Sequence, residues 1–410
     1  MRRLSPWLAL VVMLVGALIL REPRLRRIDD IVLSFFLQNS ASALPAAPVT
    51  LVEIGRDDIL RLAPAEKVKP LPKGEAARRS LSPLEYALFL QAVLDFNPPV
   101  IAIEPMLIWP ERDRIQKQIF LDQAMHVPKL LVALELGAKG QHDLTTDDLP
   151  TLPNITGNRT SLTQFVGVSR QPDEEIRLVS TPGFVNLPND QINGLRVPLV
   201  FEYRGEVVPA FTLQAIMLWL RLTPADVKVE LGSKIVLPNG WQIPLRRDGT
   251  ITINPAAIGS IQHLSLGELL FAAEEKDHHR QKSPKTDNLN QQIVLLRVAE
   301  DPLQPPNVFS TAIATIQDNA WIRPASEAVA WITVLLVALL AGFIWIISKT
   351  DFFLGAALFS AGYAMTALDV LTQRHLWLPT FPPLALICFL VVIRLLGERR
   401  QKDFSPKAAG

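Results

Sequence analysis

Apolar residues gather in four long runs, one near the start of the chain and three near its end. The first run is Pro6–Leu20, and the others are Ala328–Ile347, Phe352–Leu371 and Trp377–Leu396. Each of the last three has about 20 residues, and at a rise of about 1.5 Å per residue such a helix crosses the roughly 30 Å hydrocarbon core of a bilayer. The pattern therefore predicts one N-terminal and three C-terminal α-helical membrane spans.

The first run has two interpretations because it is short. About 15 residues rise only about 22 Å as a helix, and the apolar core of a cleaved signal peptide has a similar length. No small-x-small cleavage site follows directly, although Ala41-Ser42-Ala43 lies further on. We favour an uncleaved signal anchor over residues 1–27, in which the arginine-rich stretch Arg21–Arg27 meets lipid headgroups.

Basic residues near the ends of the spans predict the orientation of the chain. They are concentrated after the last run, whereas the second C-terminal hairpin carries only Arg374. We expect a cytoplasmic tail over residues 397–410 and a segment on the opposite side before the first C-terminal span. The arginines that follow the first run point the other way, but long translocated domains partly escape this rule. Within the runs, Asp369 and Arg394 form either a polar relay or side chains that reach the interface.

The segment between the spans, residues 28–325, alternates short β-branched runs with helical periodicity. Strand-like runs at Val49–Ile54, Val100–Ile103 and Leu130–Leu136 are separated by helical patterns at Ser82–Phe96 and Arg114–His126. This alternation predicts βαβ units and an α/β fold, with a mixed, largely parallel sheet flanked by helices.

Beyond Pro150 the elements become shorter, with a turn at Arg204-Gly205 and hairpin-like turns at Pro238-Asn239-Gly240 and Arg246-Arg247-Asp248-Gly249. A charged run at Glu274–Lys285 follows a predicted helix at Ser265–Ala273, and we interpret the run as a loop. The remaining predicted strands are Leu195–Tyr203, Lys234–Leu237, Trp241–Leu245, Thr250–Ile253 and Gln292–Val298, and the remaining helices are Phe211–Leu222 and Phe309–Ile316.

Composition narrows the function without identifying it. The net charge is +1, with charges spread along the chain, so no basic region indicates nucleic acid as a partner. Cys388 is the one cysteine, which excludes an intrachain disulfide and a cysteine-based metal site. The adjacent pair His278-His279 lacks the usual ligand spacing, so we predict neither a metal nor another cofactor. No sequence motif of a hydrolase, a phosphate-binding loop or a metalloprotease is present, and we predict no enzymatic activity.

Several segments in a fixed order carry a family resemblance. They are VTLVEIGRDDI at 49–59, SPLEYALFLQAVL at 82–94, NPPVIAIEPML at 97–107, FLDQA at 120–124, GFVNLPNDQINGLRVPLVFEYRGEVVPAFTLQAI at 183–216, IPLRRDGTITIN at 243–254 and IVLLRVAEDPL at 293–303. With the one-plus-three arrangement of spans, this order resembles the second class of CHASE-type domains, the cyclase- and histidine-kinase-associated sensory extracellular domains. The resemblance covers nearly the whole chain and implies a sensory domain outside the cytoplasm.

The chain departs from that family at three positions. Gly55 or Arg56 stands where an aspartate is usual, Glu104 replaces another aspartate, and Arg297 replaces a glycine. Domains of this family commonly precede a cytoplasmic cyclase, kinase or phosphatase. Here about 14 residues follow the last span, too few for a folded effector. We therefore expect a separate membrane or cytoplasmic effector as partner.

Two groups of polar residues are candidate ligand-binding positions. Asp57, Asp58 and Glu104 follow two predicted parallel strands, and ligand crevices lie at the carboxyl ends of such strands. The alternative is that these carboxylates cap loops and helix starts. Asp190 and Arg196 lie in the best-matching stretch of the resemblance, where a turn and a strand residue are the alternative to a ligand role.

The sequence thus predicts an inner-membrane, multi-pass bacterial protein with a signal anchor (1–27), an extracytoplasmic sensory domain (28–325), a three-helix transmembrane bundle (328–396) and a cytoplasmic tail (397–410). The expected function is that of a receptor-like protein that binds an unknown extracytoplasmic ligand, contacts membrane lipid and forms a homo-oligomer or a complex with an effector. The alternatives are an assembly component of the cell envelope and an ectoenzyme. A ligand passes a signal only by binding two conformations unequally.

Overall fold

The computed structural model describes residues 6–39, 44–55, 81–110, 113–139, 149–188, 195–278, 286–298, 307–344 and 346–403. The chain divides into two compact units. Ala43–Trp321 form an α/β unit, and Met1–Ser42 with Ile322–Gly410 form a helical unit. The helical unit therefore includes residues 28–42, which the sequence had assigned to the sensory domain.

A seven-stranded sheet forms the centre of the α/β unit. Its strand order is β15-β1-β16-β2-β3-β6, and β7 also pairs with β3. All the pairings are parallel except that of β6 with β3. The strands are β1 (Val49–Ile54), β2 (Val100–Ile103), β3 (Leu130–Gly137), β6 (Gly167–Arg170), β7 (Thr181–Phe184), β15 (Gln262–Ser265) and β16 (Ile293–Val298). The predicted mixed, largely parallel sheet is confirmed.

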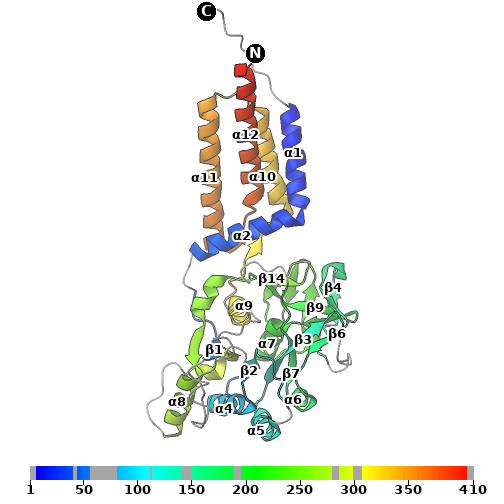
Figure 1. Cartoon of the computed structure of the whole chain (residues 1–410), viewed down its shortest axis with the longest axis vertical. Coiled ribbons are helices and arrows are strands. Elements are labelled where there is room, and N and C mark those ends of the chain that lie inside the picture. The colour runs from blue at the N-terminus through cyan, green and yellow to red at the C-terminus, as the bar shows by residue number, and fades with distance from the viewer. Residues whose placement is uncertain are drawn as a thin grey trace, which may run out of the picture. The chain divides into compact units, whose positions relative to one another are not determined.

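Helices cover both faces of this sheet, as Figure 1 shows. One face packs against α4 (Pro83–Leu94), α5 (Arg114–Ala124) and α8 (Leu266–Asp277). The other packs against α7 (Phe211–Trp219) and α9 (Val308–Gln317). Strands that are apolar on both faces, as β1, β2 and β16 largely are, are typical of a parallel sheet buried between two helical layers.

Local sequence signals explain where the elements begin. In α4, Pro83 occupies the first turn, and the backbone N–H of Ser82 donates to Glu85 Oε2 at 2.6 Å. This contact satisfies one of the donors that a helix start leaves without an intrahelical partner. The short helix α6 (Glu174–Leu178) begins after Asp173.

Short strands form three smaller sheets in the α/β unit. The turn predicted at Arg204-Gly205 joins β9 and β10, and the hairpin-like turn predicted at Pro238-Asn239-Gly240 joins β12 and β13. The hairpin predicted at Arg246-Arg247-Asp248-Gly249 is not formed by its flanking strands: the chain turns there, but β14 pairs with β8 instead of β13. The short strands are β4 (Asn154–Thr156), β5 (Gln164–Phe165), β8 (Arg196–Pro198), β9 (Val200–Tyr203), β10 (Glu206–Pro209), β11 (Lys228–Glu230), β12 (Lys234–Val236), β13 (Gln242–Pro244) and β14 (Thr250–Thr252).

The charged run after residue 273 is not wholly a loop, so that prediction was wrong for its first part. Helix α8 continues to Asp277, and the backbone N–H of His278 donates to the carbonyl of Glu274 at 3.1 Å. Glutamate and lysine are good helix formers, and their charge does not end a helix that is already nucleated. His279 lies outside the described residues.

The described residues of the helical unit form five helices. Four of them lie side by side as a bundle: α1 (Pro6–Arg21), α10 (Glu327–Gly342), α11 (Lys349–Arg374) and α12 (Phe381–Asp403). The fifth, α2 (Pro23–Asn39), lies across one end of the bundle (Figure 1) and was not predicted. At the same end, β17 (Arg323–Pro324) pairs in parallel with β18 (Leu376–Trp377).

Length and composition single out one of these helices as able to cross a membrane. Of the described residues, only Lys349–Arg374 is both long and apolar enough, while Trp7–Arg21, Glu327–Gly342 and Phe381–Leu396 are apolar but shorter. Helices α1 and α11 begin and end within three residues of the predicted runs, whereas α10 ends five residues early and α12 is displaced toward the C-terminus, because Trp377 belongs to β18. The number of membrane spans is not confirmed.

Arg394 of α12 has a buried head rather than one that reaches out to solvent. Its Nη1 donates to the carbonyl of Ile344, and its Nη2 donates to that of Ile347 at 3.2 Å. Both carbonyls follow the end of α10. Asp369 lies near the far end of α11, where its exposed carboxylate accepts from Gln373 Nε2 at 2.6 Å. About 20 residues of α11, or about 30 Å of helix, separate the two positions, so they form no relay with each other.

Candidate functional site at the carboxyl edge of the sheet

Three ionisable side chains occupy neighbouring strands where the parallel sheet ends. Glu53 of β1 is the direct partner of Arg297 of β16, and Glu104 follows β2, whose Ile103 pairs with Leu296. Strand alternation places these three on the face to which Leu51, Leu295 and Ala102 also point, which is the face that α7 and α9 cover. The fold thus brings a Glu–Arg–Glu row, called here the edge triad, to the carboxyl edge of the sheet.

Arg297 is the central member of the edge triad. Its residue is only 6% exposed. Its Nη1 donates to Asn307 Oδ1 and lies 3.9 Å from Glu53 Oε1, whereas its buried Nε has no hydrogen-bond partner among the described residues. A buried guanidinium is costly unless it is paired and fully hydrogen-bonded. The site therefore holds a buried cation, one of whose donors has no partner in the described part of the chain.

Asn307 connects the edge triad to a helix start. It precedes α9 in a left-handed conformation with φ 59°, which asparagine tolerates better than most residues do. Its carbonyl accepts from Ser310 Oγ at 3.1 Å. The start of α9 consequently lies beside Arg297, as expected for a helix that directly follows a parallel strand.

Glu104 is held by the backbone as well as by burial. Its N–H donates to the carbonyl of Leu296 at 3.1 Å, which extends the ladder between β2 and β16 by one residue. The residue is 3% exposed. A buried carboxylate and a buried guanidinium on adjacent strands provide an acceptor and a donor group within one small region, which is suited to binding a polar molecule.

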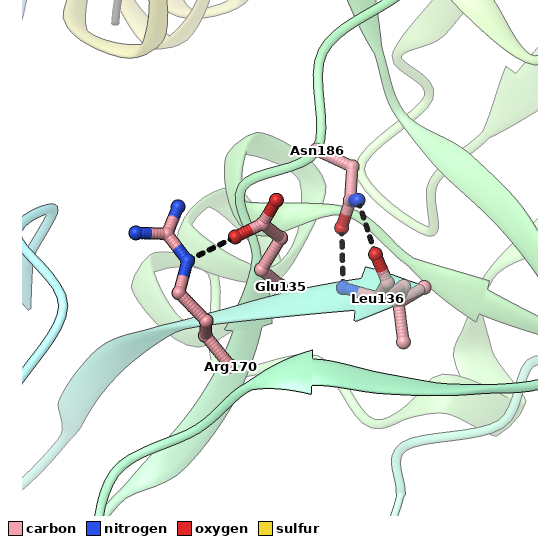
Figure 2. Close-up of polar contacts among 4 residues, drawn as sticks. All are labelled: Glu135, Leu136, Arg170 and Asn186. Atoms are coloured by element: carbon pink, nitrogen blue, oxygen red, sulfur yellow. Dashed lines mark hydrogen bonds and ion pairs between the residues drawn. The ribbon is translucent and has the colours of Figure 1, made fainter. Parts of the chain in front are cut away.

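The polar edge continues along β3, as Figure 2 shows. Glu135 forms an ion pair with Arg170 Nε of β6, next to an irregularity in the register between Glu135 and Leu136. The side chain of Asn186 donates to the carbonyl of Leu136 and accepts from its N–H, both at 2.8 Å. Beyond the end of β7, the amide of Asn186 thus takes the place of a neighbouring strand and satisfies both backbone groups of Leu136. These bonds hold the end of β3 in its extended conformation.

The structure locates two of the five candidate residues from the sequence. Glu104 lies at the carboxyl edge, as predicted. Arg196 lies on β8, where it pairs with Thr252 of β14, and so belongs to a different sheet from Glu104. Asp57, Asp58 and Asp190 lie outside the described residues.

Sequence reasoning missed Glu53, Arg297 and Asn307 as site residues. A signal for two of them was present, because Glu53 and Arg297 are charged residues inside otherwise apolar strands. Their pairing could not be derived from the pattern, since β16 is inserted between β1 and β2 from about 240 positions further along the chain. Among the described residues, no three His, Cys, Asp or Glu side chains gather in a way that could hold a metal ion.

The chain matches no protein-family model, no curated protein and no solved structure. The resemblance to CHASE-type domains therefore stays a prediction from the sequence, and the function has to be argued from the geometry.

Proposed function

We propose that this chain is a membrane-anchored, receptor-like protein whose α/β unit binds a small charged molecule at the carboxyl edge of its sheet. The observation that carries the proposal is Arg297, a buried guanidinium whose Nε–H has no partner among the residues that the structure describes, flanked in register by Glu53 and on the strand next to that of Glu104. Open α/β sheets bind ligands outside the carboxyl ends of their strands.

The outward faces of the bundle support the membrane part of the proposal. Large apolar side chains on all four helices are exposed, which water-soluble bundles avoid and lipid accommodates. They are Trp7, Leu10, Leu14 and Leu18 of α1, Ile332, Leu335, Leu336, Leu339 and Leu340 of α10, Leu354, Leu358 and Met365 of α11, and Val392, Leu395 and Leu396 of α12. In this proposal all four helices span the membrane, and the α/β unit lies outside the cytoplasm.

Signalling adds two requirements to binding. The ligand binds two conformations of the α/β unit unequally, and the helical unit passes the difference to a separate membrane or cytoplasmic effector. The chain passes from the helical unit to the α/β unit after α2 and returns to the helical unit before α10. These two connections are the covalent route for such a change.

The test is a thermal-unfolding screen of the full chain in lipid nanodiscs. The probes are free L-amino acids, dicarboxylates, inorganic phosphate and polyamines. A molecule present at about 100 times its Kd adds about 2.7 kcal/mol to the stability of the folded state, which is readily measured. The matched variants are Arg297→Gln and Arg114→Gln, since Arg114 is an exposed arginine of α5, which covers the face of the sheet opposite to the edge triad.

We expect at least one probe to raise the melting temperature of the wild type and of Arg114→Gln, but not that of Arg297→Gln. Should Arg297→Gln fail to fold, Glu53→Gln takes its place, because Glu53 is partly exposed and better tolerates substitution. If no probe class has an effect, or if the edge variants respond as the wild type does, the proposed binding function is wrong.

A docking role in the cell envelope is the second candidate, and one surface favours it. Ile115 and Ile119 lie one turn apart on α5, with exposed fractions of 80% and 41%, and Leu84 of α4 is also exposed. If this surface docks a protein, a pull-down with the wild type recovers a stoichiometric complex without any ligand. The double variant Ile115→Ser with Ile119→Ser should then recover none. Unchanged recovery would count against docking through α5.

A further inference from the structure

One row of residues crosses five neighbouring parallel strands on the face of the sheet that α7 and α9 cover. The edge triad forms the first part of the row, on β1, β16 and β2. Glu104 directly follows Ile103, the partner of Val132, so Ala133 of β3 stands beside Glu104. Gly183 of β7 is the partner of Ala133 and ends the row. The three charged side chains are therefore followed, at the same level of the sheet, by two small residues.

Both helices on this face run from the carboxyl edge back to the amino edge of the sheet. In the last turn of α7, the carbonyl of Leu218 accepts from Nζ of Lys129 at 2.7 Å, and Lys129 directly precedes β3. At the end of α9, Nε2 of Gln317 donates to the carbonyl of Pro48, directly before β1, at 3.1 Å. Since the C-terminal ends of α7 and α9 lie at the amino edge, their N-terminal ends lie at the carboxyl edge.

The starts of these two helices lie close together and lack side-chain caps. The rings of Phe211 in α7 and Phe309 in α9 are 5.3 Å apart between centroids. The residue before α7 is Ala210, which has no polar side chain to cap the helix, and Oδ1 of Asn307 before α9 accepts from Arg297 instead. A helix start presents N–H groups without intrahelical partners and about half a positive charge. The carboxyl edge therefore combines two positive helix ends with the guanidinium of Arg297.

Two buried donors at these positions have no hydrogen-bond partner among the residues that the structure describes. One is Nε of Arg297, and the other is Oγ1 of Thr212, a fully buried residue in the first turn of α7. Nη1 of Arg297 already binds Asn307, so Nε and the adjacent Nη2 form the edge of the guanidinium that can hold a carboxylate through two parallel hydrogen bonds. Buried polar groups are nearly always hydrogen-bonded. An acidic group held between Arg297 and the first turn of α9 would satisfy the Nε donor.

The charges of the edge triad favour a zwitterion over a simple anion. Two carboxylates, Glu53 and Glu104, stand on either side of the one guanidinium, Arg297. The two helix starts add about half a positive charge each, so the whole edge is close to neutral. A simple anion is repelled by both glutamates, and a simple cation is repelled by Arg297 and the helix starts. A molecule that carries one charge of each sign has a partner for both.

We infer that the edge triad binds a free α-amino acid, with its carboxylate between Arg297 and the start of α9 and its ammonium group against Glu104. The inference rests on the proposed function and names the class of its ligand. Both charged groups of an α-amino acid are attached to one carbon, which suits partners on neighbouring strands about 4.8 Å apart. Glu104 is buried and Glu53 is partly exposed, so solvent screens a pair with Glu104 less than a pair with Glu53.

Isothermal titration of the full chain in lipid nanodiscs tests the inference with three related compounds. Each common L-amino acid is titrated first. The one that binds most tightly is then compared with its amide, which lacks the carboxylate, and with the corresponding 2-hydroxy acid, which lacks the ammonium group. The same compounds are titrated into Arg297→Gln, into Glu104→Gln and into Arg114→Gln, whose exposed arginine belongs to a helix on the opposite face of the sheet.

We expect the wild type and Arg114→Gln to bind the amino acid at least about tenfold more tightly than either analogue, because each analogue lacks one charge-assisted pair. Arg297→Gln should lose affinity for both the amino acid and the 2-hydroxy acid. Glu104→Gln should lose about tenfold in affinity for the amino acid, while its affinity for the 2-hydroxy acid should equal or exceed that of the wild type. A glutamate with a purely structural role would lower both affinities alike when replaced.

The outcomes distinguish a failure of this inference from a failure of the proposed function. If the 2-hydroxy acid, a dicarboxylate or inorganic phosphate binds through Arg297 as tightly as the best amino acid, the binding function stands and the amino-acid ligand is wrong. An amino acid that binds Arg297→Gln as it binds the wild type occupies another place, which also overturns the inference. If Glu104→Gln does not fold, the comparison of the three compounds on the wild type decides alone. If no compound of any class binds, the proposed function fails and the inference fails with it.

Discussion

Asp29 in α2 accepts a hydrogen bond from the indole nitrogen of Trp377 at 2.9 Å, across 348 positions of the chain. Through the same carboxylate, α2 caps α12, and the strand that contains Trp377 pairs with Arg323–Pro324 at the entry to α10. Tyr363 of α11 joins the junction by donating to the carbonyl of Pro379 at 2.9 Å. One polar junction therefore ties together α2 and three helices of the bundle.

Replacing Asp29 should weaken this junction, and the loss of stability should differ between two variants. Asp29→Ala leaves the N–H groups of Thr380 and Phe381 without their acceptor, which costs about 1–3 kcal/mol of stability. Asp29→Asn keeps one acceptor oxygen for the three donors that now share Oδ1, so its loss should be smaller. Thermal unfolding of the full chain in nanodiscs measures both. Equal stability of Asp29→Ala and the wild type would show that the junction contributes nothing.

Arg394 should be required for the hairpin between α10 and α11. Arg394→Met keeps the length of the side chain but removes both donors to the carbonyls of Ile344 and Ile347, which costs about 1–3 kcal/mol by leaving buried acceptors unpaired. Arg394→Lys can donate to one of the two carbonyls, so its stability should lie between that of the wild type and that of Arg394→Met. Reversible unfolding in mixed micelles provides the comparison. A methionine variant as stable as the wild type would contradict this role.

The pH dependence of stability should reveal the environment of Asp318. Burial raises the pKa of Asp318 above its ordinary value of 3.8, although a hydrogen bond from Ser260 opposes the shift. The folded state is therefore penalised when this carboxyl is charged, and the penalty disappears as the pH falls through the raised pKa. Asp318→Asn should have a higher melting temperature than the wild type near neutral pH, and the difference should vanish below pH 3.8, the ordinary pKa of the group.

Asp226 is the control of opposite sign. Hydrogen bonds from the hydroxyl and the backbone N–H of Thr223 lower the pKa of Asp226 below 3.8. Its charge therefore stabilises the folded state above that value, and the contribution is lost as the pH falls through the lowered pKa. Asp226→Asn should melt lower than the wild type near neutral pH, again with a difference that fades in acid. If both variants changed the melting temperature in the same direction near neutral pH, the opposite pKa shifts of Asp318 and Asp226 would be refuted.

Close packing of α7 on the sheet depends on Gly183 in β7. A Cβ added there would lie 2.6 Å from Phe211 Cδ2 and 2.9 Å from Leu131 Cδ1, so Gly183→Ala should cost about 1–3 kcal/mol through overpacking. Gly259→Ala meets no atom within 4 Å and should be close to neutral. Chemical denaturation compares the two variants. Similar midpoints would mean that α7 can shift without cost.

Most of the central sheet follows from local pattern, because its strands β1, β2, β3 and β16 are largely apolar runs. Val49–Ile54 and Val100–Ile103 are strands with the predicted boundaries. Helix α2 was not predicted because its first half, Pro23–Asp30, is highly charged, and the apolar residues of its second half follow one another too closely to show a helical period.

The candidate site was predictable only in part, for a topological reason. Glu104 ends a recognisable strand, so its place at the carboxyl edge could be inferred. Arg297 becomes a site residue only because β16 inserts between β1 and β2, and that order is a product of tertiary packing rather than of any local signal.

The side of the membrane on which the α/β unit lies is measured most directly with an impermeant maleimide on intact spheroplasts. In a Cys388→Ser background, one variant carries Gln118→Cys, on the exposed face of α5, and another carries a cysteine appended after Gly410. A membrane-anchored receptor with an external α/β unit predicts that the cysteine at 118 is labelled in intact spheroplasts, and the appended cysteine only after permeabilisation. Labelling of both cysteines in intact spheroplasts, or of the appended cysteine alone, would contradict it.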